Sequence, residues 1–180
     1  MFDRETVSLW IHTTGQAVVG DYKSTILEFL PSTVTTWARW KKEHPDSLVL
    51  DVRQGKGARF NLNRKPASGG ISVGQPGSRL KLYPLELFQK QSIINDNLGR
   101  TPIVVVHDPE TFAFHAYERG QLNFRLNADG TVEDQSGREW DLFTGTSGED
   151  TLKALPATPW LINAWKRFYP RGQIYPDETR

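Results

Sequence analysis

Apolar and polar positions along the chain alternate in short runs, which predicts many short strands and few helices. Residues 103–107 and 112–118 are rich in β-branched and aromatic side chains and flank a turn at residues 108–111, a pattern typical of a hairpin. Further short runs separated by turn residues follow as far as Phe143, with the spacing of an antiparallel meander. Leu85 and Phe88 share one face of a short predicted helix. The pattern therefore predicts an α+β chain, mostly an antiparallel β-meander with short helices.

Part of the sequence recurs within the chain. Identical residues stand 125 positions apart in six pairs: Leu30 and Leu155, Pro31 and Pro156, Thr33 and Thr158, Trp40 and Trp165, Lys41 and Lys166, Pro45 and Pro170. Upstream, SLWIHTTG from Ser8 resembles REWDLFTG from Arg138, and the register requires a gap of five residues. We interpret the recurrence as one full and one partial copy of a repeat made of strand, loop, helix and strand.

The second copy contains the clearer helix signal. Thr158 is expected to cap this helix, with Pro159 at its first position, where the missing N–H loses no hydrogen bond. Pro170 is expected to end the helix. The residues spaced to form its apolar face are Leu161, Ala164, Trp165 and Phe168.

The first copy predicts a similar helix. Thr33 is expected to cap it and Pro45 to end it, while Val34, Trp37 and Trp40 face the core. Burying each repeated Trp stabilises the fold by roughly 2 to 3 kcal/mol, so packing is sufficient to explain their recurrence.

These patterns divide the chain into three parts. Residues 1–53 are the end of the first repeat, and residues 78–176 form a β-rich second repeat with a C-terminal helix. Residues 54–77 are rich in glycine, proline and basic side chains and lack apolar periodicity, which favours a linker.

Charge and composition exclude several classes of protein. With 22 basic and 21 acidic residues the net charge is +1, so no overall field draws the chain to nucleic acid, and we expect no nucleic-acid partner. The chain has no cysteine, which excludes disulfides and thiolate chemistry. No apolar run reaches about 18 residues, so membrane insertion is not expected.

Several long segments resemble a known family. They are MFDRETVSLW, LPSTVTTWARWKKEHPDSLVL, YPLELF followed by IINDNLGRTPIVVV, and REWDLFTG. Over residues 1–175 the chain resembles the bacterial and archaeal family called domain of unknown function 3179. The resemblance implies a protein built from two related halves, in which this chain corresponds to the end of the first half and the whole second half. It also implies a longer parent protein that carries an export signal.

The chain departs from this family at its reactive motifs. In the family's first half, a His-Glu-x-x-Asn-Asp motif precedes a strand that ends in Cys-Pro-x-Cys, a plausible redox or metal site. Here Gln91 and Ser92 occupy the positions of His and Glu. Residues 108–111, Asp-Pro-Glu-Thr, occupy the position of Cys-Pro-x-Cys. If the family's chemistry lies at those positions, this chain keeps the turn and lacks the reactive groups.

One cluster in the sequence suggests a metal site, because histidine and carboxylate side chains suit zinc or a similar ion. It consists of His107, Asp108, Glu110 and His115. The predicted hairpin pairs His107 with Phe112 and His115 with Val104, which puts the two imidazoles on opposite faces. We therefore predict no shared metal ion and no cofactor, and retain both histidines as candidate ligand-binding residues.

Two other candidates remain. Basic residues just before and within residues 54–77 could bind an anion or an acidic polymer; alternatively, the segment is a solvated linker. These residues are Arg53, Lys56, Arg59, Arg64 and Lys65. Asp96, between Asn95 and Asn97, is more simply part of a turn than a ligand or an acid–base group.

No constellation typical of nucleophilic catalysis is present, so the leading interpretation is a non-catalytic structural or binding module of a larger extracytoplasmic protein. The alternative is a fragment of a redox or metal-dependent enzyme whose active half lies upstream. Pairing with a missing N-terminal half, or self-association through open strand edges, is the expected partnership. The chain is extracytoplasmic if it belongs to an exported parent and cytoplasmic if it starts at Met1 as written.

Overall fold

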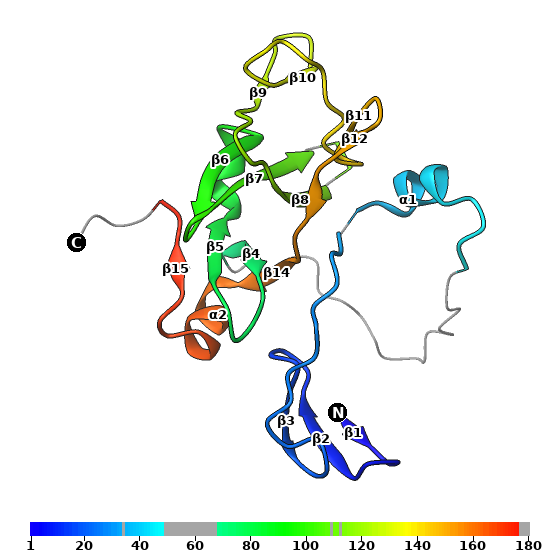
Figure 1. Ribbon diagram of the computed structural model, residues 1–180, viewed down its shortest axis with the longest axis vertical. Coiled ribbons are helices and arrows are strands. Elements are labelled where there is room, and N and C mark those ends of the chain that lie inside the picture. The colour runs from blue at the N-terminus through cyan, green and yellow to red at the C-terminus, as the bar shows by residue number, and fades with distance from the viewer. Residues whose placement is uncertain (34, 49–67, 109, 112, 177–180) are drawn as a thin grey trace.

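The computed structural model describes residues 1–33, 35–48, 68–108, 110–111 and 113–176. They form a β-rich, mostly antiparallel α+β structure (Figure 1), as the sequence predicts. No helix in this part of the chain is both long and apolar enough to cross a bilayer. The elements in residues 1–48 are β1 (Phe2–Asp3), β2 (Ser8–Ile11), β3 (Gln16–Val19) and α1 (Trp37–Glu43).

Two four-stranded sheets form the main body. The first has the order β13-β8-β7-β6 and is antiparallel throughout. The second has the order β14-β4-β5-β15, in which β15 runs parallel to β5. The bounds are β4 (Gly69–Gly74), β5 (Leu80–Pro84), β6 (Ile93–Leu98), β7 (Thr101–Asp108), β8 (Ala113–Glu118), β13 (Lys153–Ala154), β14 (Ala157–Leu161) and β15 (Gln173–Ile174).

Shorter elements complete the body. A 3-10 helix, η1 (Leu85–Gln89), follows β5 where the sequence predicts a short helix, and Phe88 is its buried residue. Two small hairpins lie above the first sheet in Figure 1. They and the second α-helix are β9 (Arg125–Leu126), β10 (Val132–Glu133), β11 (Thr146–Ser147), β12 (Asp150–Thr151) and α2 (Ile162–Phe168).

The core lies on both faces of β7, because successive side chains of a strand point to opposite faces. Ile103 and Val105 pack in a cluster with side chains of β4 and β5, which joins the two sheets. Val104 and Val106 pack in a second cluster with Trp140 and other side chains that follow β8. The first sheet is therefore covered on both sides.

The predicted start of the second helix is wrong. Residues Ala157–Leu161 form β14, in which Thr158 pairs with Ser72 and Pro159 with Ile71 of β4. Proline is tolerated there because β14 is an edge strand and needs no further N–H donor. The helix α2 begins at Ile162, and Trp165 is fully buried as predicted, whereas Leu161 is exposed.

The predicted cap of the first helix is also wrong. Thr36, not Thr33, is the N-cap of α1, and its Oγ1 accepts a hydrogen bond from the Arg39 N–H at 3.3 Å. The helix ends before Pro45, as predicted. Trp37 is 49% exposed, so it does not face a core within the described residues. Val34 lies outside the described residues.

The hairpin of β7 and β8 forms as predicted, but in a different register. His107 pairs with Phe114, and His115 pairs with Val106. In both pairs the partner lies two residues further along the chain than predicted, because Asp108 pairs with Ala113 and not with residue 111. A shift of two residues preserves strand alternation, so the two imidazoles still lie on opposite faces of the sheet.

Two other segments differ from their sequence interpretation. Asn95, Asp96 and Asn97 are part of β6, where they pair with β7, instead of forming a turn. Pairing with a long buried strand has overridden the turn preference of these side chains. Of the range 54–77, interpreted as a linker, residues Gly69–Gly74 form β4, an inner strand of the second sheet.

The internal repeat stays a prediction, but the two helices correspond closely. Each has seven residues, and they begin 125 positions apart. Their C-cap residues, His44 and Tyr169, have φ and ψ values of −129° and 71° and of −127° and 67°.

Gly172 lies against the buried Trp165 ring, and alanine there should destabilise the fold. An added Cβ would stand 2.1 Å from Trp165 Cη2, far inside van der Waals contact. We expect Gly172→Ala to lower the free energy of unfolding by about 1 to 3 kcal/mol, measured by urea denaturation. In a Trp165→Leu background the same change should have a much smaller effect, and an equal loss in both backgrounds would contradict this contact.

Candidate functional site

A cavity of about 810 Å³ lies between α1, the end of the β7–β8 hairpin and the segment around Phe143. The chain preceding α1 is held at the hairpin by two hydrogen bonds to the Thr111 carbonyl. The Thr36 N–H donates at 3.1 Å and Thr35 Oγ1 at 3.3 Å. Arg39 on α1 thereby comes to line the same cavity as His115 on β8, although the two residues are far apart in sequence.

His115 forms part of the cavity wall on the Val106 face of the sheet. Its ring meets the Phe143 ring edge-on, with centroids 4.8 Å apart. Its Nε2 atom is buried and has no hydrogen-bond partner among the described residues. Burial lowers the pKa of His115 to about 4, against the opposing effect of the Asp141 and Asp108 carboxylates. The imidazole is therefore neutral near pH 7.

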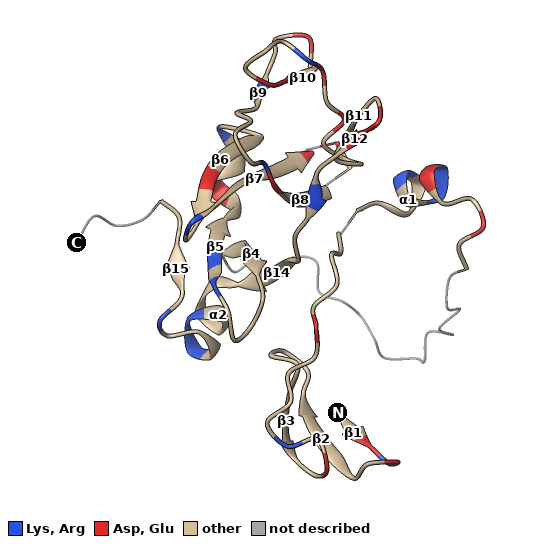
Figure 2. Cartoon of the chain, viewed as in Figure 1, with Lys and Arg blue, Asp and Glu red and all other residues tan. Residues whose placement is uncertain are grey.

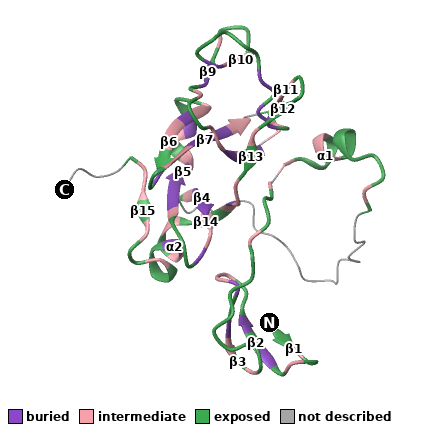
Figure 3. Cartoon of the chain, viewed as in Figure 1, coloured by how far each residue is buried: buried purple, intermediate pink, exposed green. Residues whose placement is uncertain are grey.

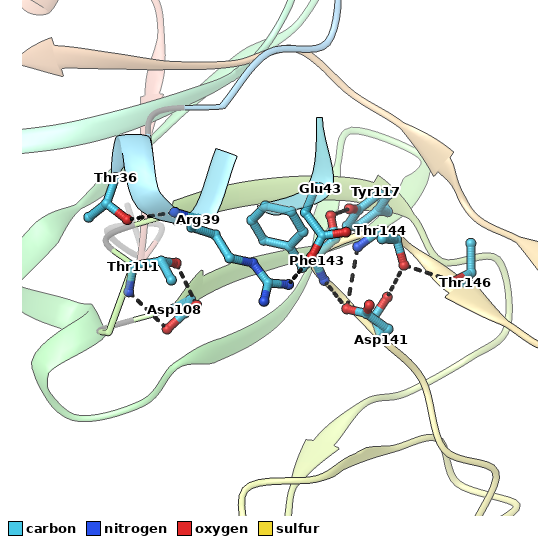
Figure 4. A network of polar contacts seen from close by, with 10 residues as sticks. All are labelled: Thr36, Arg39, Glu43, Asp108, Thr111, Tyr117, Asp141, Phe143, Thr144 and Thr146. Carbon is cyan, nitrogen blue, oxygen red and sulfur yellow. Dashed lines mark hydrogen bonds and ion pairs between the residues drawn. The ribbon is translucent and has the colours of Figure 1, made fainter. Parts of the chain in front are cut away.

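Arg39 lies over the Phe143 ring (Figure 4). Its guanidinium carbon lies 4.2 Å from the ring centroid, a cation–π contact. Its Nη2 lies 3.3 Å from Glu43 Oε1, one helical turn further along α1. Its Nε atom, like Nε2 of His115, is buried without a hydrogen-bond partner in the described part of the chain.

Two carboxylates in the lining are engaged in turns. Asp108 Oδ1 accepts hydrogen bonds from the N–H groups of Glu110 and Thr111 at 2.8 and 3.3 Å. Burial raises the pKa of Asp108, but hydrogen bonds from Thr111 and Glu110, together with Arg39, outweigh it and leave the pKa below its usual value. Asp141 Oδ1 likewise accepts from the Phe143 N–H at 2.8 Å. Both aspartates serve to shape the cavity rim.

The cavity is acidic. Its ionisable lining, apart from the neutral histidines, comprises one cation, Arg39, and four carboxylates, which sum to −3: Asp108, Glu110, Glu139 and Asp141. Acidic residues recur along the whole segment from β9 to β12 (Figure 2). Apolar side chains, including Leu142 and Phe143, complete the lining.

The sequence candidates are distributed unevenly around this site. His107 and His115 both line the cavity, but from opposite faces of the sheet, and the His107 ring stacks on Phe114 at 4.3 Å. Within the described ranges, no group of three or more His, Asp or Glu side chains is arranged to hold a metal ion. The candidate anion-binding residues lie outside the described residues: Arg53, Lys56, Arg59, Arg64 and Lys65.

Asp96 belongs to a buried polar network that sequence reasoning missed. Its Oδ2 lies 2.7 Å from Lys81 Nζ and accepts a hydrogen bond from Tyr83 Oη at 2.7 Å. Lys81 is 1% exposed, and the Tyr175 ring stacks on Tyr83 at 5.3 Å. Lys81 and Tyr83 share one face of β5, so strand alternation could have placed Lys81 beside a core aromatic ring. None of these three polar residues lines the cavity beneath α1.

Comparison with known proteins gives a family match for the N-terminal part of the chain. Residues 1–69 match the model of the family described as Protein of unknown function (DUF3179). The chain contains a DUF3179 family domain. No curated protein and no solved structure matches the chain. The DUF3179 match includes Arg39 but not His115, so the cavity combines residues inside and outside the matched range.

The pKa of His115 makes stability depend on pH. Because the pKa is lowered from 6.5 to about 4, the unfolded chain binds this proton first, and stability is lost as the pH falls from 6.5 towards 4. Between pH 7 and 5 we expect the wild type to lose about 1 to 2 kcal/mol more than His115→Gln, measured by urea denaturation. An NMR titration showing an ordinary pKa for His115 would contradict its burial.

Proposed function

We propose that the chain is a non-catalytic structural or binding module of a larger extracytoplasmic protein, and that the cavity beneath α1 is its ligand site. The observation that carries the proposal is the pair of buried nitrogen atoms, Arg39 Nε and His115 Nε2, in the wall of one cavity. A buried polar atom without a hydrogen bond costs about 1 to 3 kcal/mol. A ligand that supplies hydrogen bonds to these atoms would recover part of that cost.

The ionisable groups of the cavity support binding rather than catalysis. A histidine with a pKa of about 4 is a weak base near neutral pH, where a general base is most effective with a pKa close to 7. Asp108 and Asp141 use their carboxylate oxygens to hold the backbone of the cavity rim. They support the shape of the site and are not placed as an acid–base pair.

The charge of the lining indicates the class of ligand. Four carboxylates against one guanidinium favour a positively charged group. The Arg39 Nε–H is a donor, so the ligand also needs an acceptor. The side chains of Leu142 and Phe143 favour a short apolar part. We therefore propose a small organic cation that carries an uncharged acceptor group.

The test compares two probes that share a methoxypropyl chain and carry opposite charges, 3-methoxypropylammonium and 4-methoxybutyrate, by NMR on ¹⁵N-labelled protein. The cation is expected to cause saturable shifts at His115 and Phe143 that weaken with added salt, and the carboxylate to bind less tightly. Tighter binding of the carboxylate, or no saturable shift at the cavity from either probe, would refute the proposal.

A matched pair of variants locates the binding site. Glu139→Gln removes a charge from the lining, and Glu149→Gln removes one just outside it. We expect Glu139→Gln to weaken binding of the cation by about two- to fivefold, and Glu149→Gln to leave it nearly unchanged. Equal effects would indicate a general response to net charge.

A further inference from the structure

Large apolar side chains are exposed along the N-terminal part of the chain. Residues 1–48 are mostly exposed in Figure 3, in contrast to the buried strands of the main body. Leu27 is 45% exposed and Leu30 is 73% exposed, and both precede the exposed Trp37 of α1. We call Leu27, Leu30 and the half-buried Trp40 the N-terminal apolar surface.

Each residue of this surface has an identical residue 125 positions later: Leu152, Leu155 and Trp165. The local backbones correspond as well. The Leu27 N–H donates to the Gly15 carbonyl at 2.9 Å, and the Leu152 N–H donates to the Gly145 carbonyl at 2.8 Å. The bridge between Gln16 and Ile26 corresponds to the pair Thr146 and Thr151.

The environments of the two sets differ sharply. Trp165 is fully buried, and its indole N–H donates to Ser72 Oγ of β4 at 2.9 Å. The Trp40 indole N–H instead donates to Ser47, three residues beyond its own helix cap. Leu155 packs against the core between the sheets, whereas Leu30 is exposed. Identical side chains on matching local structure are thus less covered in the first copy: Leu27 and Leu30 are exposed and Trp40 is half-buried, whereas Trp165 is fully buried.

The covering surface in the second copy is known in detail. It is the sheet unit formed by residues 69–118, in which β4 pairs with β14 and supplies Ser72. The Ala116 carbonyl on β8 accepts a hydrogen bond from the Leu155 N–H at 2.8 Å. We infer that the N-terminal apolar surface binds a second β-sheet unit built like residues 69–118. An edge strand of that unit would pair with the backbone at Leu30, and one of its hydroxyl groups would accept a hydrogen bond from the Trp40 indole N–H.

A second copy of this chain does not offer that unit. Its own Leu155 and Trp165 already occupy the sites on β8 and β4 that the N-terminal apolar surface would need. The partner is therefore a sheet unit whose corresponding sites are free. This inference is independent of the ligand cavity, because it rests on Leu27, Leu30 and Trp40, and none of them lines that cavity.

The absence of cysteine from the sequence allows a direct test with single thiols. Leu30→Cys is prepared in the full chain and in an extended chain that carries a duplicate of residues 68–130 directly before Met1. Trp10 and Trp140 stand 130 positions apart, so this junction preserves the spacing of the second copy. The rate of alkylation by N-ethylmaleimide reports whether residue 30 is covered.

We expect alkylation at residue 30 to be at least about tenfold slower in the extended chain than in the full chain. Leu48→Cys, at a position that is 96% exposed, should react at the same rate in both and serves as the control. An unchanged rate at residue 30 overturns the inference, because a sheet that does not form against this surface is not its partner. Protection that rises with concentration of the unextended chain also overturns it, in favour of a second copy.

Discussion

Replacing Asp96 with alanine is expected to lower the free energy of unfolding by about 3 to 5 kcal/mol, the range for breaking a buried ion pair. The Lys81 ammonium lies 2.7 Å from Asp96 Oδ2 and is 1% exposed, so the substitution removes a counter-ion from a charge that water does not reach. Tyr83 Oη loses an acceptor in the same step. Urea denaturation at pH 7 measures the loss.

The control for this prediction is an ion pair at the surface. Lys153 Nζ also lies 2.7 Å from a carboxylate, Glu118 Oε1, but the Lys153 side chain is 73% exposed. Glu118→Ala is expected to cost less than about 1 kcal/mol, because water screens the pair. Equal losses for the two variants would show that Lys81 is accessible to water in solution.

The two repeated tryptophans provide the second large contrast. Trp165→Ala removes a fully buried ring and the hydrogen bond to Ser72, and we expect it to cost about 3 to 5 kcal/mol. Trp40→Ala should cost about 1 kcal/mol or less, because Trp40 is half-buried, its ring lies against His44 at the end of α1, and its indole N–H bonds to nearby Ser47. Thermal or urea unfolding of both variants measures the difference.

The Trp40 result also bears on the N-terminal apolar surface. In the chain extended by residues 68–130, Trp40→Ala should become several-fold more destabilising, because the ring is then covered as Trp165 is.

Similar losses for the two tryptophans in the unextended chain would contradict the difference in burial described for them.

Local patterns in the sequence were sufficient for some elements of the fold. The hairpin of β7 and β8 combines β-branched runs with a turn, and both signals lie within a few residues of each other. The segment Ala157–Leu161 shows the opposite case. Thr158 and Pro159 carry good helix-start signals, yet pairing with β4, more than 80 residues earlier, determines their conformation. The residues around Thr158 and Pro159 carry no information about that partner strand.

The candidate site was accessible to sequence reasoning in part. His115 was singled out, and strand alternation correctly separated it from His107. Arg39 was not, because nothing near it in sequence indicates that α1 lies over Phe143. Lys81 was missed because a lysine in a short strand is usually solvated, and its burial depends on Asp96 from another sheet.

The most direct test of the ligand site is whether Arg39 lies on the Phe143 ring in solution, since this contact brings α1 over the cavity. At 4.2 Å from the ring centroid, the Arg39 side-chain protons should be shifted upfield by the ring current and show NOEs to the ring. Both signals should disappear in Phe143→Leu. Ordinary Arg39 shifts that do not respond to this substitution would show that α1 does not cover the cavity and would contradict the proposed site.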